Sequence, residues 1–328
     1  MAVYVNTNYS ALQGQRYLGN VQNQLTTTYQ RLSSGMRINS AKDDAAGLQI
    51  ADRLTSQING LNQGNRNASD GIALAQTIES GMDEISGMLQ KMRTLTVQAA
   101  NGTNTMSDRQ ALGKEMTSLA NEINRIATST TFAGKTVLNG VGADSIYGKA
   151  AGGPGAPGGA QDGDKTKAGS TGTMTLQVGS NKGDTIAFDV NSVMFSKLGI
   201  AAAIMDNGDT KIFKVKDGVV TVQLSKADYS NPQAALYIGA AIDALDTAIA
   251  SIDGQRANLG AIQNRLESSI RNQSNVAANE ADARSRIRDA DFAEESANLS
   301  QQSIIQQAAA SMLMQANTRP QLGLSLLG

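Results

Sequence analysis

The feature that most constrains this chain is the apolar pattern of its two ends, which has the spacing of long helices. Within residues 44–99 the pattern advances by threes and fours, and residues 234–272 repeat it near the opposite end. A helix over 44–99 would span roughly 80 Å, whereas a usual globular helix has about 11–12 residues. Its narrow apolar stripe must be covered by the other end of the chain or by other copies of it. The pattern therefore predicts a rod that assembles, not an enzyme with a pocket.

The composition argues against several classes of function. The 328 residues include no His and no Cys, so His-based catalytic triads and the usual zinc ligands are absent. The net charge is −1, without a basic cluster that could neutralise phosphates, which argues against a nucleic-acid partner. We therefore expect no catalytic residue, no metal and no cofactor.

The N-terminal segment does not have the pattern of a cleavable secretory signal. Residues 1–8 carry neither a basic region nor an apolar core, and no stretch of the chain is long and apolar enough to cross a membrane. If the protein leaves the cell, we expect it to do so by a route that reads no such signal.

Helix start and stop signals divide the chain. Ser40 with Asp43 predicts the start of the first long helix, and Ser107 with Gln110 predicts the start of a second helix that doubles back. A last helix is predicted over about 285–317, with Pro320 stopping it. The central residues have a different pattern. Gly and Pro are frequent at 148–172, which predicts a loop or linker, and short strands are predicted at 174–178, 186–190, 211–215 and 219–224.

Together these signals predict a mainly α fold: a long antiparallel coiled-coil rod built from both chain ends, with a small β-rich central insert. We expect an N-terminal helix and connector at 1–40, rod helices and the start of a β-hairpin at 41–142, and a surface-exposed insert at 143–231. A C-terminal rod helix at 232–282 and a terminal helix at 283–328 complete the division.

Several segments resemble the bacterial flagellins. Residues 31–48, Arg-Leu-Ser-Ser-Gly-Met-Arg-Ile-Asn-Ser-Ala-Lys-Asp-Asp-Ala-Ala-Gly-Leu, are similar to the N-terminal signature of that family, as is 89–98. Near the other end, three segments are similar to the family's C-terminal signatures: 259–266, 283–291 and the last segment, from Gln306 to Leu327. The resemblance covers roughly residues 1–142 and 233–328.

The resemblance implies a structural subunit that polymerises non-covalently into the extracellular flagellar filament. In that family the outermost helices are disordered in the free subunit and order in the filament core. Export runs through the flagellar type III apparatus without cleavage. The implied partners are other copies of the chain, an export chaperone, the filament cap protein, hook-associated junction proteins and a host Toll-like receptor, with no nucleic acid and no membrane insertion.

The apolar pattern of the terminal helices and the resemblance to the flagellins each indicate a set of candidate residues. We expect assembly to use apolar residues of the terminal helices, namely Leu18, Val21, Leu25, Leu32, Leu299, Ile304, Met312, Leu313, Leu326 and Leu327. The positions that match the family's receptor-recognition and lateral-contact face are Gln90, Lys91, Arg93, Leu95, Gln98 and Glu115. On a period of 3.6 residues, 91, 95 and 98 share a face distinct from the apolar seam. Lys91 stands where well-recognised relatives carry Arg, and it lacks the planar fork of a guanidinium.

Two alternatives stay open. One is a hook–filament junction protein, which shares paired terminal coiled coils but usually carries Pro where this chain has Ala41 or Ala45. The other is a filament subunit whose central insert adds adhesion.

Overall fold

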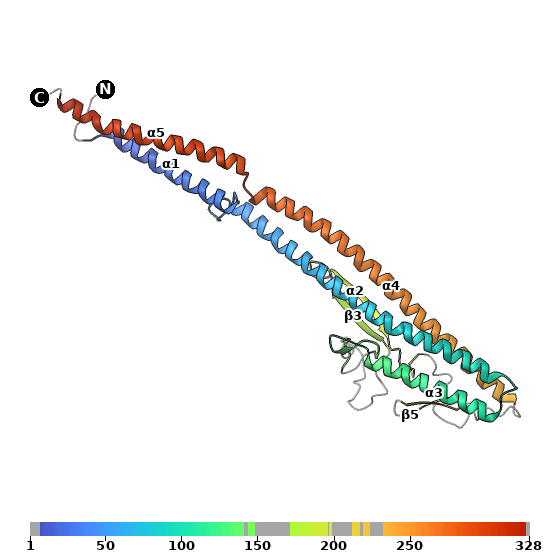
Figure 1. Ribbon diagram of the computed structural model, residues 1–328. Helices are drawn as coiled ribbons and strands as arrows, with labels where there is room; N and C mark the ends of the chain where they lie inside the picture. Colours follow the sequence, from blue (N-terminus) through green and yellow to red (C-terminus); the bar gives the residue numbers. More distant parts are fainter. Residues whose placement is uncertain are drawn as a thin grey trace, which may run out of the picture. The chain divides into compact units, whose positions relative to one another are not determined.

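A computed structural model describes residues 7–140, 144–147, 171–195, 197–198, 212–216, 219–223 and 232–325. Of residues 215–216, 232–237 and 319–325 it describes the backbone only. This part of the chain contains five helices: α1 (Tyr9–Ser34), α2 (Ala45–Ala100), α3 (Met106–Ser129), α4 (Pro232–Arg288) and α5 (Phe292–Ser325) (Figure 1). It also contains three antiparallel hairpins: β1 (Thr131–Phe132) with β2 (Lys135–Thr136), β3 (Thr171–Gln177) with β4 (Thr185–Asn191), and β5 (Phe213–Lys216) with β6 (Val219–Val222). The prediction of a mainly helical chain with strands in its central insert is confirmed.

The chain divides into two compact units. The first, called here the terminal unit, comprises residues 1–60 and 275–328, and the second, the central unit, comprises 61–274. Helices α1 and α5 belong wholly to the terminal unit, whereas α3 and the strands belong to the central unit. Each of α2 and α4 contributes residues to both.

The central unit is built on an antiparallel pairing of α2 with α4. A heptad of buried positions runs along α2 through the whole unit: Leu61, Gly64, Ala68, Gly71, Ala75, Ile78, Met82, Ile85, Leu89, Met92, Thr96 and Ala99. Leu74, Gly81, Ser86 and Leu95 are buried beside it. Polar contacts along the flanks fix the antiparallel direction: Gln263 donates to Glu79 (2.9 Å), and Arg256 pairs with Asp83 (2.9 Å). The large residues of this seam, such as Met82 and Leu89, are fully buried.

The short helix α3 begins with a capping box, two residues earlier than the sequence signal suggested. The Thr105 hydroxyl accepts from the N–H of Asp108 (3.3 Å), and the Asp108 carboxylate accepts from the N–H of Thr105 (2.9 Å). The predicted capping box of Ser107 with Gln110 is therefore wrong, because Thr105 and Asp108 form the capping box that satisfies the free N–H groups at the start of the helix.

The β3–β4 hairpin rests on a groove of small residues along α2. A Cβ added to Gly64 would overlap the carbonyl of Val178, and one added to Gly71 would overlap the side chain of Leu176. The Asn67 amide donates to the Gln177 carbonyl (2.9 Å). The two glycines, seven residues apart on one face of α2, therefore allow the hairpin to approach the helix backbone closely.

Polar side chains of α3 hold the β5–β6 hairpin by its backbone. The Asn121 amide accepts from the N–H of Val220 (3.0 Å) and donates to the carbonyl of the same residue (3.3 Å). One helical turn earlier, the Thr117 hydroxyl accepts from the N–H of Val222 (3.0 Å). The helix thus serves as a partner for the edge of β6.

The C-terminal helices have different limits from those predicted. α4 continues past residue 282 to Arg288, and α5 begins at Phe292 and passes Pro320 to end at Ser325, whereas one helix over 285–317 was predicted. The break occurs where Asp291 caps α5, since its Oδ1 accepts from the N–H of Ala293 (2.8 Å). The prediction that Pro320 stops the helix is wrong.

Candidate assembly surface of the terminal unit

The terminal unit pairs α1 with α5 in antiparallel fashion (Figure 1). The facing positions of α1 follow a heptad of buried and half-buried residues: Ala11, Gly14, Leu18, Val21, Leu25, Thr28 and Leu32. Those of α5 follow a matching one: Glu295, Leu299, Gln302, Gln306, Ala309, Leu313 and Ala316. The two series meet as a coiled-coil seam.

This seam is much thinner than the one in the central unit. Among the described side chains of α1 and α5, only Val21, Thr28, Glu295 and Ala309 are buried, and Val21 alone of these is an aliphatic residue larger than alanine. Each residue that is ordered costs on the order of 1–2 kcal/mol of backbone entropy. The pair therefore buries little apolar surface against the cost of ordering two long helices.

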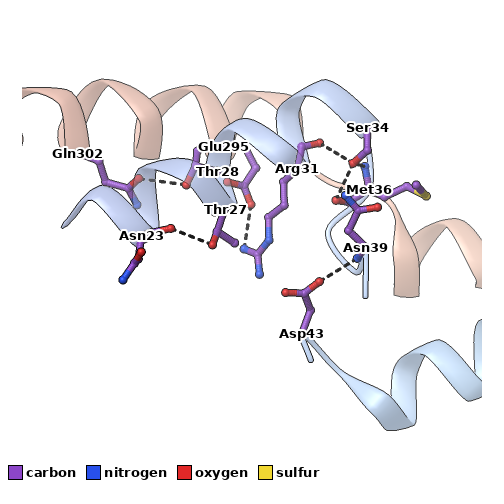
Figure 2. Close-up of polar contacts among 10 residues, drawn as sticks. All are labelled: Asn23, Thr27, Thr28, Arg31, Ser34, Met36, Asn39, Asp43, Glu295 and Gln302. Atoms are coloured by element: carbon purple, nitrogen blue, oxygen red, sulfur yellow. Dashed lines mark hydrogen bonds and ion pairs between the residues drawn. The ribbon is translucent and has the colours of Figure 1, made fainter. Parts of the chain in front are cut away.

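Polar groups within the seam connect the two helices (Figure 2). The Thr28 hydroxyl donates to Oε1 of Gln302 (3.1 Å), and Nη1 of Arg31 donates to Oε1 of Glu295 (3.2 Å). Glu295 is only 7% exposed, so its carboxylate depends on the Arg31 guanidinium for charge compensation. Polar pairs at seam positions favour one alignment of the helices over its neighbours.

Backbone bonds join the end of α1 to the junction between α4 and α5. The carbonyl of Arg288 accepts from the N–H groups of Arg37 (2.7 Å) and Ile38 (3.3 Å), and Ala290 donates to the carbonyl of Gly35 (3.0 Å). Gly35 has φ +69°, a left-handed conformation that suits glycine and ends α1. Segments far apart in sequence are thus held together independently of side-chain packing.

The connector between α1 and α2 is a turn organised by two aspartates. Oδ2 of Asp43 accepts from the N–H of Ser40 (2.8 Å), from its hydroxyl (3.1 Å) and from the N–H of Asn39 (3.1 Å; Figure 2). These bonds, the one from the Ser40 backbone foremost, hold the pKa of Asp43 below its usual value. The N-cap of α2 is Asp44, whose Oδ1 accepts from the N–H of Gly47 (2.9 Å), so the predicted cap at Ser40 is wrong. Ser40 belongs to the preceding turn.

Large apolar side chains remain exposed outside the seam. Among the described residues, α1 and α5 carry eight of the thirteen exposed large hydrophobic side chains: Tyr9, Leu12, Tyr17, Tyr29, Phe292, Ile304, Met312 and Met314. Each of the eight is more than half exposed. Such a concentration is typical of surfaces that contact another molecule.

The structure sorts the predicted assembly residues into two groups. Six lie in the seam within one chain: Leu18, Val21, Leu25, Leu32, Leu299 and Leu313. Ile304 and Met312 are exposed, and Leu326 and Leu327 lie outside the described residues. Sequence reasoning missed the exposed side chains of α1, which stand out as large apolar residues off the heptad on an otherwise polar helix.

The residues predicted as a recognition face lie on α2 and α3 of the central unit. Gln90, Lys91, Arg93, Gln98 and Glu115 are exposed. Two of them pair across helices of this unit: Lys91 Nζ lies 2.8 Å from Glu115 Oε1. Arg93 pairs through two nitrogens with Asp246 of α4, which raises the pKa of the guanidinium.

Leu95 does not lie on this face. It is 8% exposed and belongs to the core of the central unit, so the prediction that it shares an outer face with Lys91 and Gln98 is wrong. Here α2 contacts two helices: Thr96 reaches Met116 of α3, and Arg93 reaches Asp246 of α4. A helix with two partners buries a wider arc than a single seam, and position 95 falls within it.

Two searches of the described residues bear on other kinds of site. No group of three or more His, Cys, Asp or Glu residues is placed to hold a metal ion in this part of the chain. No helix in it combines the length and apolar character needed to cross a membrane.

Comparison with known families gives two matches at the chain ends. Residues 5–143 match the family described as the bacterial flagellin N-terminal helical region. Residues 242–327 match the bacterial flagellin C-terminal helical region. The matched ranges contain α1 to α3 and α5 entire, together with most of α4.

Curated relatives match over the whole chain. Flagellin A of Vibrio anguillarum is 39% identical over 380 aligned positions, which cover all of this chain and all of that protein. Flagellin B of Vibrio cholerae serotype O1 is 37% identical over 377 positions, again with complete coverage of both.

A solved structure shares the fold. The structure of a putative flagellar hook-associated protein from Vibrio parahaemolyticus superposes with a TM-score of 0.50, covering 75% of this chain and all of that one. Its sequence identity is 16%, so the likeness concerns the fold alone.

Proposed function

The chain belongs to the bacterial flagellin family, and from this premise we propose that its terminal helices drive assembly by ordering and packing against those of neighbouring copies. As a member of a structural family, it is a subunit of the flagellar filament that polymerises with copies of itself. The likeness to a hook-associated protein supports the junction alternative only through a shared fold. The relatives that match over the full length of the chain are flagellins.

The observation that carries this proposal is the contrast between the two seams. The seam of the central unit contains fully buried Leu, Ile and Met side chains, whereas the described side chains of the α1–α5 seam include one buried aliphatic residue larger than alanine. The central unit can therefore fold alone. The terminal helices need additional burial to offset their ordering entropy, and neighbouring copies supply it.

The exposed side chains of α1 and α5 provide the surface for that burial. In the proposal, Ile304, Met312 and Met314 on α5 and the tyrosines and Leu12 on α1 contact neighbours, while the seam residues align the two helices within each copy. A face that meets a different face on the next copy gives a contact that does not close on itself. Repetition of such a contact produces an open helical polymer.

The functional division of the chain follows from this assignment. Residues 1–40 and 283–328 form the filament-core segments, 41–142 and 232–282 form the supporting helices, and 143–231 form the insert exposed on the filament surface. We propose export without signal cleavage through the flagellar type III apparatus. A chaperone would cover the C-terminal segment before export, and the cap protein would insert each subunit at the filament tip.

The exposed group Gln90, Lys91, Arg93, Gln98 and Glu115 is proposed as a lateral contact face that a host Toll-like receptor also recognises. Its charges are already paired within the subunit, and Leu95 is buried, so the receptor would contact a polar face with little apolar surface.

Seeded growth tests the proposed function. Purified full-length chain is added to short filament fragments and elongation is followed by electron microscopy, beside a truncation that lacks residues 292–328. We expect the full chain to extend the seeds and the truncation to leave them unchanged while keeping the thermal unfolding of its central unit. Equal extension by both would overturn the assignment of α5 to assembly.

A further inference from the structure

We propose that Asn8 acts beside the Thr28–Gln302 and Arg31–Glu295 pairs to set the register of α1 against α5, by donating a hydrogen bond to a carbonyl that Pro320 deprives of its helical donor. Asn8 is thereby a positioning residue for the α1–α5 pair, a role that deepens the proposed assembly function and does not itself require filament growth.

The Asn8 amide is used at both of its ends. Its Nδ2 donates to the carbonyl oxygen of Ala316 in α5 (2.8 Å), and its Oδ1 accepts from the N–H of Ala11 in the first turn of α1 (3.1 Å). One side chain therefore caps the start of α1 and attaches that start to α5.

The acceptor of this bond is special because of its position in α5. In an α-helix, the carbonyl of one residue accepts from the N–H four residues later. For Ala316 that residue is Pro320, which has no N–H. The Asn8 amide supplies the missing donor, which offsets the lost hydrogen bond that makes the proline costly within α5.

The same chemistry discriminates between alignments of the two helices. A slip of one heptad would place Asn8 opposite Ala309, whose carbonyl has a regular donor four residues later in Leu313. The amide would then lose its open acceptor, and the Ala316 carbonyl would lose its substitute donor. Near this end of the seam α1 carries the small residues Ala11 and Gly14, which oppose such a slip only weakly.

Engineered disulfides can report the register, since the chain contains no Cys. A Cβ built on Gly14 lies 3.9 Å from Cβ of Leu313, within the roughly 3.5–4.5 Å that a disulfide requires. The pair Gly14→Cys with Leu313→Cys therefore reports the observed register, and Gly14→Cys with Gln306→Cys reports a slip of one heptad. The readout is the ratio of the two intramolecular oxidation rates, measured on seeded filaments and on the free full-length chain. A disulfide traps a pairing of the two helices even where that pairing forms only transiently, so a failure of growth would still leave the free chain as a test of register.

The decisive variants are Asn8→Asp and Pro320→Ala. Asp keeps an oxygen that can cap α1 but cannot donate to Ala316, so we expect N8D to lower the rate ratio roughly two- to tenfold, the shift that one net hydrogen bond gives. P320A returns an N–H to the Ala316 carbonyl and so removes the open acceptor that Asn8 selects. P320A alone should therefore lower the ratio by a similar factor, and adding N8D to P320A should lower it little further. An unchanged ratio in N8D, or an N8D effect that is as large in the P320A background as in the parent, would overturn the proposal.

Discussion

Replacing two strongly exposed apolar side chains of α5, Ile304 and Met312, with serine should weaken filament growth without unfolding the subunit. Ile304 is 66% exposed and Met312 is 72% exposed, so neither contributes much to packing within one chain. Both lie outside the α1–α5 seam. The double variant I304S/M312S therefore removes surface that only a neighbouring copy can bury.

The size of the effect follows from the exposed fractions. Complete burial of such a side chain is worth about 1.5–3 kcal/mol, so burial of the exposed two-thirds contributes about 1–2 kcal/mol per residue. For the two together the loss is about 2–4 kcal/mol. Since about 1.4 kcal/mol corresponds to a tenfold change, the subunit concentration left at the end of growth should rise roughly 30- to several-hundredfold.

The assay is seeded growth to a plateau, followed by sedimentation and measurement of the remaining soluble subunit. The matched control is Q301S/Q307S, which changes two exposed polar residues of the same helix and should shift the plateau less than about threefold. A plateau for I304S/M312S equal to that of the control would refute the claim that these side chains are buried between subunits.

Three further predictions concern a seam ion pair, the packing of the β3–β4 hairpin on α2, and the connector between α1 and α2. R31M should lower the stability of the assembled α1–α5 pair to urea by about 1–3 kcal/mol, because it leaves the buried Glu295 carboxylate uncompensated. R31M/E295L removes that carboxylate as well and should recover most of the loss. Equal losses in both variants would contradict this reasoning. G64A should speed amide exchange of β3–β4 because its Cβ would overlap the Val178 carbonyl, whereas G87A, with open space around it, should not. Asp43 has a lowered pKa in the folded chain, so its contribution to the connector is present above its ordinary value of 3.8 and is lost as the pH falls below that value. D43N should therefore flatten the acid-side change in exchange of the Asn39 and Ser40 amides, and an unaltered profile would count against this assignment.

The heptads were the most predictable part of this fold. Steps of three and four at Ile78, Met82, Ile85 and Leu89 identify the buried side of α2 because one narrow stripe must face one partner. Leu95 escaped the same reasoning. Periodicity assumes a single seam, and only the arrival of α3 and α4 on two sides of α2 shows that position 95 is covered.

The ends of the helices were predicted less well because their signals compete. Asp44 caps α2 although Ser40 is also a good cap, and the choice depends on Asp43 organising the preceding turn. Pro320 is a strong local stop signal that a tertiary contact from Asn8 offsets. Local propensity cannot reveal a donor that lies more than three hundred residues away in the sequence.

The candidate assembly surface was predicted only in part. Reading apolar residues of the ends as assembly contacts could not separate Leu18 and Val21, which serve the seam within one chain, from Ile304 and Met312, which remain exposed. That separation depends on the phase of the α1 heptad relative to the α5 heptad, which a sequence does not state. The two phases are fixed by polar contacts such as the Thr28–Gln302 bond.

The central claim is that the terminal helices order only when neighbouring copies bury their exposed side chains, and amide hydrogen exchange of the full-length chain tests it most directly. Exchange is measured for residues 9–34 and 292–318 in the free subunit and in seeded filaments, with residues 75–99 of α2 as the internal reference. The account predicts rapid exchange of both terminal segments in the free subunit, strong protection in the filament, and a protected reference in both states. Terminal segments as protected in the free subunit as in the filament would contradict it.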